Sequence, residues 1–228
     1  MYDLNTEYFK EIDTKEKAYI LGFIFADGGI ARVNEVPYRL DISQKSNGRD
    51  VLEYIKECLG FSGPILYDQP SKLNGKIFYR DRLQISRKKF VSHLVNLGVV
   101  PNKSLILAAP SINNDFVGSF VRGYFDGDGS AGIYYRKDGV IVGNIQFDGT
   151  YNVLNWIRSF IGGPSLSTKS NIYRYQIRSL KQLSIALALM ADSPFGMERK
   201  SKVLDKLAAR CEQSNVKTPN NGGSLNSD

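Results

Sequence analysis

Apolar and polar residues along the chain follow helical and strand-like spacing in the same order twice. Each series begins with a helix, continues with two strands, an amphipathic helix and a second hairpin, and ends with a further helix. The first series predicts strands at 30–34 and 38–45, a helix at 48–59 and a hairpin at 64–86. The second predicts strands at 132–136 and 140–147, a helix at 150–161 and a hairpin at 164–178. The pattern indicates an α+β fold of two αββαββα halves with antiparallel sheets.

Local residue choices mark two of these boundaries. Asp13 and Glu16 have the spacing of a capping box, so the first helix is expected to begin at Asp13. Asp138-Gly139 has the composition of a tight hairpin turn between the two strands that open the second half.

One segment of the chain is repeated. Residues 18–28 have the sequence AYILGFIFADG and residues 119–129 have SFVRGYFDGDG, and five matching positions are separated by 101 residues. Later matches have offsets of 102 and 97, as loops of different length would produce. We therefore expect two related half-domains, at 1–110 and 111–211. Residues 212–228 are rich in Asn, Ser and Gly and are predicted to form a flexible tail.

Small residues in the repeated segment recur every four positions, which places them along one stripe of a helix. They are Ala18, Gly22 and Ala26 in the first copy and Ser119, Gly123 and Gly127 in the second. Glycine inside a helix costs about 0.5–1 kcal/mol relative to alanine, so its presence in both copies needs a reason. We expect the two helices to pack side by side along these stripes. The alternative is that each stripe accommodates a neighbouring strand.

An aspartate and a glycine follow each stripe directly, as Asp27-Gly28 and Asp128-Gly129. If the helices pack in parallel, both aspartates lie at the same end of their interface. Two carboxylates so close repel one another unless a cation lies between them. Oxygen ligands of this kind suit Mg²⁺, and Mn²⁺ or Ca²⁺ fit the same sites. A single Asp-Gly pair would be interpreted as an ordinary helix end, but two at the repeat offset predict a metal site.

Composition narrows the chemistry further. Lys and Arg number 30 against 23 for Asp and Glu in 228 residues, which gives a net charge of +7 and favours an anionic partner. One histidine and two cysteines exclude a His/Cys zinc site, and catalytic triads would all depend on that histidine. The longest apolar run has nine residues, at 18–26, so no membrane partner is expected. We expect an intracellular location, in the cytoplasm, the nucleoid or an organellar matrix.

Residues 20–28 and 121–129 resemble the nine-residue signature motif of LAGLIDADG homing endonucleases, in the single-chain form with two motifs. The motif positions retained are Gly22, Asp27, Gly28, Gly123, Asp128 and Gly129. The sequence departs from the motif at its first and second positions and, in the first copy, at the sixth, Phe25. The resemblance covers residues 15–210. It implies saddle-shaped antiparallel sheets, packed through two parallel motif helices, in an intron-encoded type of DNA endonuclease.

Strand alternation supports a DNA-contacting surface. In residues 76–86 the polar side chains fall on one face, and Ile77, Tyr79, Leu83 and Ile85 fall on the other, predicted to be core. Arg and Gln suit guanine and adenine edges, and Lys suits phosphates, although each residue alone is also an ordinary surface charge. The candidate DNA-binding residues are Arg32, Arg39, Lys45, Lys76, Arg80, Arg82, Gln84, Arg136, Lys137, Arg174, Gln176 and Arg178.

The resemblance also implies roles for residues near the two aspartates. In similar proteins a basic residue from each half stabilises charge on the scissile phosphate, and Lys103 and Lys200 occupy matching places. Lys202 is an alternative to Lys200. Gln44 and Gln146 share an offset of 102 and are candidates to order water, with Asp148 as a competitor.

The predicted function is metal-dependent hydrolysis of two phosphodiesters in a long, nearly non-palindromic DNA site by a monomer with no obligate protein partner. Asp27 and Asp128 are the predicted metal ligands. One alternative is a maturase-like RNA binder or DNA-binding regulator that does not cut. Another is a structural repeat protein whose glycines serve packing alone, which would show no salt-dependent DNA affinity.

Overall fold

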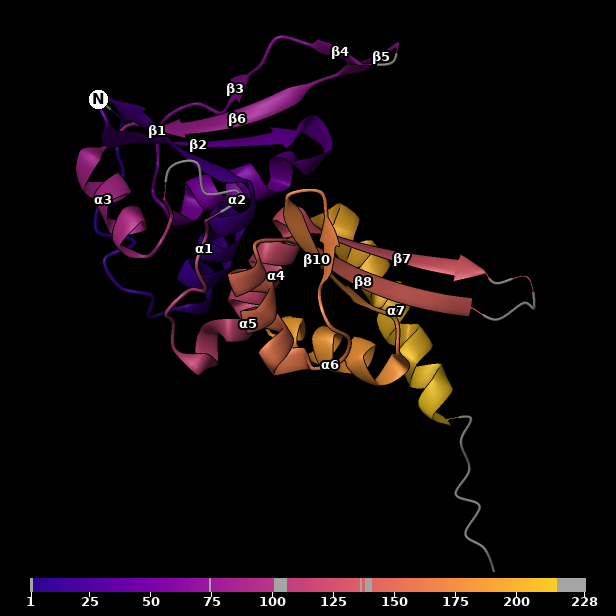
Figure 1. Cartoon of the computed structure of the whole chain (residues 1–228). Helices are drawn as coiled ribbons and strands as arrows, with labels where there is room; N and C mark the ends of the chain where they lie inside the picture. The colour runs from indigo at the N-terminus through magenta and orange to yellow at the C-terminus, as the bar shows by residue number, and fades with distance from the viewer. Residues whose placement is uncertain (1, 74, 101–105, 136, 138–140, 217–228) are drawn as a thin grey trace, which may run out of the picture.

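The computed structural model describes residues 2–73, 75–100, 106–135, 137 and 141–216, and its two halves have a similar succession of elements (Figure 1). The elements of the first half are α1 (Lys15–Asp27), β1 (Gly28–Val33), β2 (Val36–Lys45), α2 (Arg49–Cys58), β3 (Leu66–Tyr67), β4 (Ser71–Leu73), β5 (Lys76–Phe78), β6 (Arg80–Ile85) and α3 (Lys88–Asn96). Those of the second are α4 (Val117–Asp128), β7 (Gly129–Tyr135), β8 (Ile141–Gly149), α5 (Tyr151–Ile161), β9 (Ser167–Lys169), β10 (Ile172–Ile177), α6 (Leu180–Ala191) and α7 (Glu198–Val216).

Each half contains a four-stranded antiparallel sheet. The strand order is β1-β2-β6-β3 in the first sheet and β7-β8-β10-β9 in the second, while β4 and β5 form a separate two-stranded sheet. Alternate residues of β2 and β6, such as Leu40, Ile42 and Leu83, are fully buried against the helices. In the second sheet, the fully buried residues include Ile145, Phe147 and Tyr175. The expected α+β fold with two related halves is therefore confirmed.

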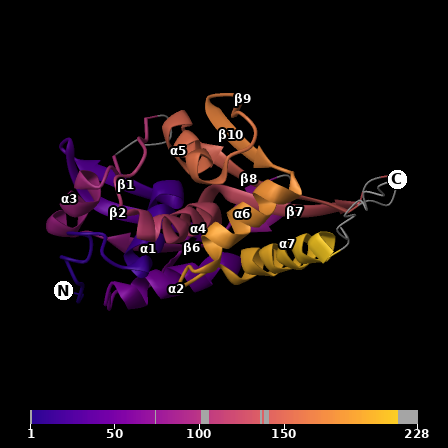
Figure 2. The ribbon, with the colours of Figure 1, turned by 90° about the horizontal axis from the view of Figure 1, so that it is seen from below.

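Helices α1 and α4 lie side by side at the centre of the molecule in both views (Figures 1 and 2). A Cβ atom added to Gly22 would lie 2.1 Å from the carbonyl oxygen of Phe120, and one added to Gly123 would lie 1.9 Å from that of Tyr19. Both separations are far below a possible contact, so the two backbones touch where the glycines stand. The order of these contacts along both helices makes the pair parallel. The predicted packing along the small-residue stripes is confirmed.

The start of α1 differs from the prediction. Its N-cap is Thr14, whose side chain accepts a hydrogen bond from the backbone N–H of Lys17 at 3.3 Å. Asp13 instead forms an ion pair with the Lys17 side chain at 2.6 Å. Threonine and aspartate are both good N-cap residues. Because the Asp13 carboxylate binds the Lys17 side chain, Thr14 caps the helix.

The predicted hairpin at 64–86 is interrupted. Ile77 and Tyr79 were expected in the core, but they are 58% and 60% exposed. Ile77 lies in β5, which pairs with β4 in the small sheet, and Tyr79 lies between β5 and β6, so neither belongs to the four-stranded sheet that covers the helices. The apolar pattern therefore continues past the point where the core ends. The turn predicted at Asp138-Gly139 lies outside the described residues.

Helix α7 has no counterpart among the described elements of the first half and continues to Val216, beyond the start predicted for the tail at residue 212. It packs along β7 and against α6 (Figure 2). Within the described part of the chain, no helix is long and apolar enough to cross a membrane.

Candidate functional site

The chain turns directly from helix into strand after each of the two aspartates. Asp27 ends α1 and Gly28 begins β1, just as Asp128 ends α4 and Gly129 begins β7. A Cβ atom on Gly28 would lie 2.8 Å from the carbonyl oxygen of Ile24, and one on Gly129 would lie 2.5 Å from that of Phe125. Glycine is required at both turns because any side chain would strike the preceding helical turn. Each aspartate is thereby left at the tip of its helix.

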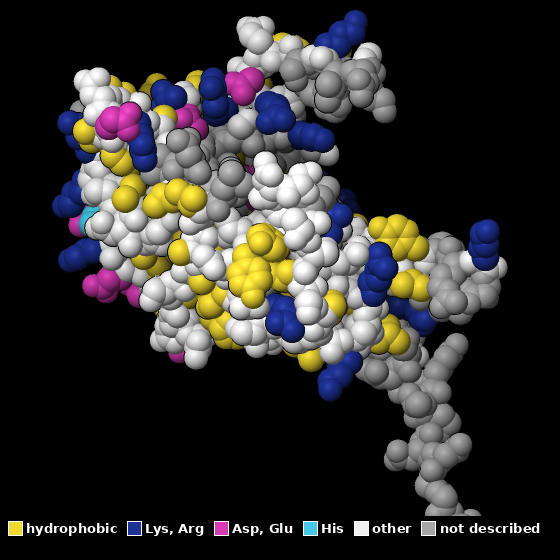
Figure 3. Space-filling model, in the orientation of Figure 1, with side chains coloured by type: hydrophobic (Ala, Val, Ile, Leu, Met, Phe, Trp, Pro, Cys, Tyr) yellow, Lys and Arg dark blue, Asp and Glu magenta, His cyan; other side chains and the backbone are white. Residues whose placement is uncertain are grey.

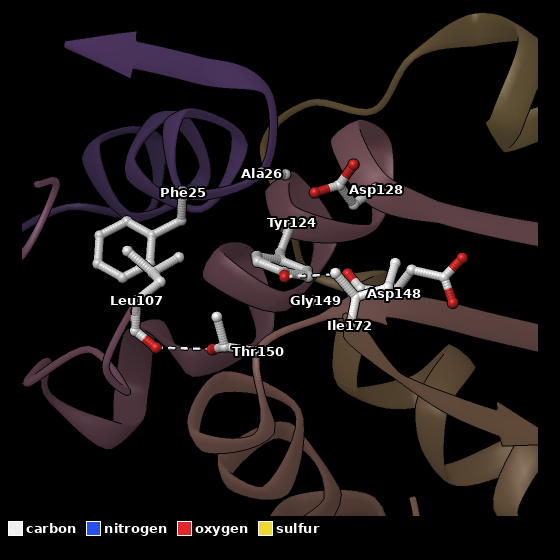
Figure 4. Close-up of a pocket in the computed structure, with 9 residues that line it drawn as sticks. All are labelled: Phe25, Ala26, Leu107, Tyr124, Asp128, Asp148, Gly149, Thr150 and Ile172. Atoms are coloured by element: carbon white, nitrogen blue, oxygen red, sulfur yellow. Dashed lines mark hydrogen bonds between the residues drawn. The ribbon is translucent and has the colours of Figure 1, made fainter. Parts of the chain in front are cut away.

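The parallel packing of α1 and α4 brings these two tips together. A Cβ atom added to Gly127 would lie 2.3 Å from Cβ of Ala26 and 3.4 Å from the Oδ2 atom of Asp27. The Asp27 carboxylate therefore lies over the last turn of α4, beside Asp128, and Figure 4 shows Ala26 next to the Asp128 side chain. The two helix ends that carry Asp27 and Asp128 therefore meet, which is the arrangement that the predicted metal site requires.

Gln44, near the end of β2, holds one of the two carboxylates. Its side-chain amide donates a hydrogen bond to Oδ2 of Asp27, and the residue is 6% exposed. A buried amide bound in this way fixes the rotamer of Asp27 and turns the carboxylate toward α4. Gln44 was predicted near the metal site, and the structure places it in contact with Asp27.

The expected equivalence of Gln44 and Gln146 is wrong. Gly28 pairs with Ile42, fourteen positions later, whereas Gly129 pairs with Phe147, eighteen positions later. The first hairpin of the second half is thus four residues longer, and the true counterpart of Gln44 is Gly149. Gln146 lies instead on the outer face of the sheet, opposite Gln176.

Tyr124 occupies the space that a side chain at position 149 would need. A Cβ atom on Gly149 would lie 2.0 Å from the Tyr124 hydroxyl, which donates to the backbone carbonyl of Asp148 at 3.1 Å. Burial raises the pKa of Tyr124 well above its ordinary value, and the carboxylates of Asp128, Asp148 and Asp27 raise it further. The hydroxyl is therefore a permanent donor in the second half, where the first half has an amide.

A cavity of about 220 Å³ opens beside this hydroxyl (Figure 4). Asp128 and Asp148 contribute polar walls, and Phe25 and Leu107 contribute apolar ones. Figure 4 shows the two carboxylates well apart, with that of Asp148 directed away from Asp128. Asp148 is bound by Arg174 through two hydrogen bonds of 2.7 and 2.8 Å, so it is held at the sheet and not at the helix tips.

Lys200, in the first turn of α7, binds the C-terminal end of α4. Its amine donates to the backbone carbonyls of Phe125, Gly127 and Gly129 at 2.7, 3.0 and 2.7 Å. These carbonyls lie at the C-terminus of α4 and the start of β7, where a positive charge is favourable. Burial lowers the pKa of the amine to about 8. Lys200 therefore positions the turn that carries Asp128.

The other basic candidates are placed differently. Lys202 is exposed and forms an ion pair with Glu198 at 2.6 Å, so it does not replace Lys200 at the helix tip. Lys103 lies outside the described residues.

A buried acid next to the site was not predicted from the sequence. Asp126 is fully buried, and its Oδ2 atom accepts from the Tyr19 hydroxyl at 2.7 Å, the backbone N–H of Met197 at 2.9 Å and Arg122 at 3.2 Å. Burial raises the pKa of Asp126, and these partners oppose the rise. The network joins α1, α4 and the start of α7, so it fixes the helix pair behind the two tips. A charged residue within an apolar helical stretch was the available signal.

The outer face of the first sheet carries the predicted polar residues. Strand register places Lys45 opposite Arg80, Ser43 opposite Arg82 and Asp41 opposite Gln84. Arg39 shares this face and is bound to Asp41 at 2.9 Å. The residues between them, apart from the buried Asp81 and Gln44, are apolar and face the helices. The predicted alternation is confirmed for β6, and β2 has the same alternation.

The second sheet repeats this arrangement. Asp148 lies opposite Arg174 and Gln146 lies opposite Gln176, on the face away from the helices. Arg178 follows β10 and is exposed. The space-filling view shows a hollow between the arm that carries β4 and β5 and the end of the second sheet, with Lys and Arg side chains along the arm (Figure 3).

The remaining DNA-binding candidates lie at the margins or outside the described parts. Arg32 is exposed near the first hairpin and forms an ion pair with Glu35 at 2.9 Å. Lys76 belongs to the small sheet of β4 and β5, and Lys137 is exposed. Arg136 lies outside the described residues.

The donor set at the helix tips fits a divalent cation in part. Asp27 and Asp128 supply hard carboxylate oxygens, which Mg²⁺ prefers. Among the described residues, no group of three or more His, Cys, Asp or Glu side chains is placed to hold a metal ion. A phosphate and water would have to supply the remaining ligands. The arrangement therefore suits a metal ion that binds together with an anionic substrate.

Comparison with solved structures identifies the fold. The chain superposes on the LAGLIDADG meganuclease I-AabMI bound to uncleaved DNA with a TM-score of 0.59 and 16% identity, covering 87% of this chain and 91% of that one. The LAGLIDADG homing endonuclease I-GzeII in complex with its DNA target gives 0.61 and 12% identity, covering 89% and 93%. I-LtrWI, bound to target DNA, gives 0.58 and 12%, covering 93% and 92%.

These likenesses span nearly the whole of each chain, so the protein has the fold of the LAGLIDADG homing endonucleases. At such low identity the likeness concerns the fold alone. No protein-family model matches the sequence, and no curated protein matches it.

Proposed function

We propose that the protein is a site-specific DNA endonuclease that hydrolyses one phosphodiester in each strand of a long, nearly non-palindromic duplex with a divalent metal ion, and that it acts as a monomer. The observation that carries this proposal is the meeting of the two parallel helix ends that carry Asp27 and Asp128. Three structurally similar proteins are LAGLIDADG nucleases crystallised with DNA, which supports the same substrate here.

The side chains around the tips suit hydrolysis of a phosphodiester. Asp27 and Asp128 would hold the metal, which when bound activates water and neutralises charge on the phosphate. Gln44 orients Asp27, and Lys200 fixes the turn that carries Asp128. The Tyr124 hydroxyl stays protonated and lines the cavity beside Asp128. The sheets supply the binding surface, because their outer faces carry Arg, Lys and Gln side chains in register.

A selection from randomised duplexes tests the proposal. The protein is incubated with the library in Mg²⁺, and cleaved molecules are recovered and sequenced. We expect a defined site cut on both strands, with no cutting in EDTA.

The non-cleaving alternative predicts a different result. Tight and selective retention of DNA or RNA without any strand cut in Mg²⁺ or Mn²⁺ would reject the endonuclease and favour a maturase-like binder or a regulator.

A further inference from the structure

Three acidic residues stand on the sheet faces that the proposed function assigns to DNA, and each is bound to an arginine. Asp41 binds Arg39 at 2.9 Å, Asp68 binds Arg82 at 2.8 Å, and Asp148 binds Arg174 at 2.7 Å. Carboxylates on a surface that meets phosphates repel the ligand, so their presence weakens overall affinity. Their placement beside arginines needs a separate explanation.

Two of these arginines occupy the same position in the two sheets. Arg82 lies opposite Ser43, next to the buried pair of Ile42 and Leu83. Arg174 lies opposite Asp148, next to the buried pair of Phe147 and Tyr175. The carboxylate that binds the arginine nevertheless comes from opposite sides.

In the first sheet the acid is Asp68, which follows β3, and in the second it is Asp148 in β8. Asp68 stands on the same face because its backbone N–H donates to the carbonyl of Arg80 at 3.0 Å, which continues the pairing of β3 with β6. Equivalent arginines therefore have acidic partners of different origin.

Stability does not explain these pairs. The side chains are partly exposed, with 38% and 26% for Arg82 and Asp68 and 25% and 23% for Arg174 and Asp148. Ion pairs of this exposure contribute little to folding, because water already solvates the separate charges well.

The geometry instead restrains the guanidinium, through two hydrogen bonds in Arg174 and through one contact each in Arg39 and Arg82. Asp148 accepts from both Nε and Nη2 of Arg174, which fixes the plane of the fork and leaves Nη1 available for a further acceptor. Asp41 is itself held by the amide of Gln84 at 2.6 Å, so the acid cannot swing away from Arg39.

A paired arginine is a poor phosphate ligand and a good base ligand. The carboxylate offsets its charge and so weakens its attraction to phosphates, whereas the restrained guanidinium still offers donors toward the two acceptors of guanine, O6 and N7. Ordering the side chain in advance also lowers the entropy lost on binding.

We propose that Asp41, Asp68 and Asp148 are specificity-determining residues, which hold Arg39, Arg82 and Arg174 for contact with guanine edges and prevent them from binding phosphates. This inference rests on the proposed function, since it assumes that the outer sheet faces bind DNA.

Asp68→Asn provides the sharpest test, because Asp68 is bound to Arg82 and lies outside the residues that line the cavity beside Asp128. Its matched control is Glu53→Gln, which removes the same charge from an Arg pair of 2.8 Å on α2. Binding is measured in Ca²⁺ by fluorescence anisotropy, at several salt concentrations, to a site recovered by binding selection and to a duplex of random sequence.

Asp68→Asn is expected to bind the random duplex about five-fold more tightly at 0.15 M salt, and the slope of log K against log salt is expected to steepen by about 0.9. The ratio of affinities for selected and random duplexes is expected to fall about ten-fold. Arg82→Lys should lose the same selectivity, since an ammonium group cannot form the planar contact. Glu53→Gln should leave the ratio unchanged.

An unchanged ratio in Asp68→Asn, or equal weakening toward both duplexes, would overturn the inference. The absence of any salt-dependent affinity of the wild-type protein for duplex DNA would reject the proposed function, and the inference with it. Thermal unfolding of each variant identifies loss of folding, and Asp68→Asn is expected to melt within about 2 °C of the wild type.

Discussion

Replacement of Gly123 by alanine tests whether the helix pair depends on backbone contact. The added Cβ atom would lie 1.9 Å from the carbonyl oxygen of Tyr19, where ordinary contact begins at 3.4 Å, so α1 and α4 must separate by about 1.5 Å. Overpacking of this kind costs about 1–3 kcal/mol of stability. The cost here lies at the upper end of that range, because the added atom meets rigid backbone. Alanine regains about 1 kcal/mol through its helix propensity. We expect a net loss of about 2 kcal/mol.

The loss is measured as the free energy of unfolding in urea, and as a fall in Tm of about 4–8 °C for a chain of this size. Gly29→Ala is the matched control, because its added Cβ would lie 3.8 Å from the nearest atom, the carbonyl oxygen of Asp41. It should change stability by less than about 1 kcal/mol. A Gly123→Ala protein as stable as the wild type, or more stable, would refute the reasoning, because helix propensity alone predicts that sign.

Two further predictions concern the residues around the helix tips. The folded-state pKa of Lys200, about 8, lies below its ordinary value of 10.5, so the unfolded chain binds more protons between these pH values. As pH rises from 8 to 10.5, the wild type should therefore gain up to roughly 3 kcal/mol of stability relative to Lys200→Met. The free energy of unfolding is measured in urea, without metal. Parallel plots of this free energy against pH for the two proteins would contradict the prediction. Gln44→Ala should slow cutting of one strand about ten-fold or more relative to the other, because only Asp27 loses its amide donor. Gln146→Ala, on the outer face of the sheet, should leave the cutting rates equal to those of the wild type at saturating protein, as followed with separately labelled strands.

The features that could be predicted from the sequence are those that one short segment encodes. The repeat of Gly22 and Gly123 predicts the helix pair because only backbone contact explains glycine within both helices. The repeat of Asp27 and Asp128 then places both aspartates at one end of the pair, because each follows its packing glycine by five residues and the helices are parallel.

Features that depend on loop length could not be predicted in this way. The hairpin between β7 and β8 is four residues longer than that between β1 and β2 when counted between equivalent pairs. The 3-10 turn at Ser46–Gly48 lengthens the next connection in the first half, where five positions separate Gln44 from the start of α2 but two separate Gly149 from α5. These changes nearly cancel, so the helices that follow keep an offset of 102 and conceal the shift. The offset of 102 therefore makes Gln146 resemble a counterpart of Gln44, although their strands pair differently.

Contacts across the fold also have no sequence signal. The binding of Lys200 to three carbonyls at the tip of α4 depends on where α7 lies, and α7 has no counterpart among the described elements of the first half. The space that Tyr124 takes from position 149 depends on the packing of α4 against β8. Both follow from tertiary packing, which the spacing of residues along one segment does not determine.

Cleavage by the variants Asp27→Asn and Asp128→Asn tests the central claim most directly, with the selected duplex, Mg²⁺ and each strand labelled. Asparagine keeps the shape of the side chain and removes its charge. Both variants are expected to retain binding of the duplex within about ten-fold and to lose double-strand cleavage by at least about a hundred-fold. Full cleavage of both strands by either variant would contradict the assignment of the paired helix tips as the catalytic centre.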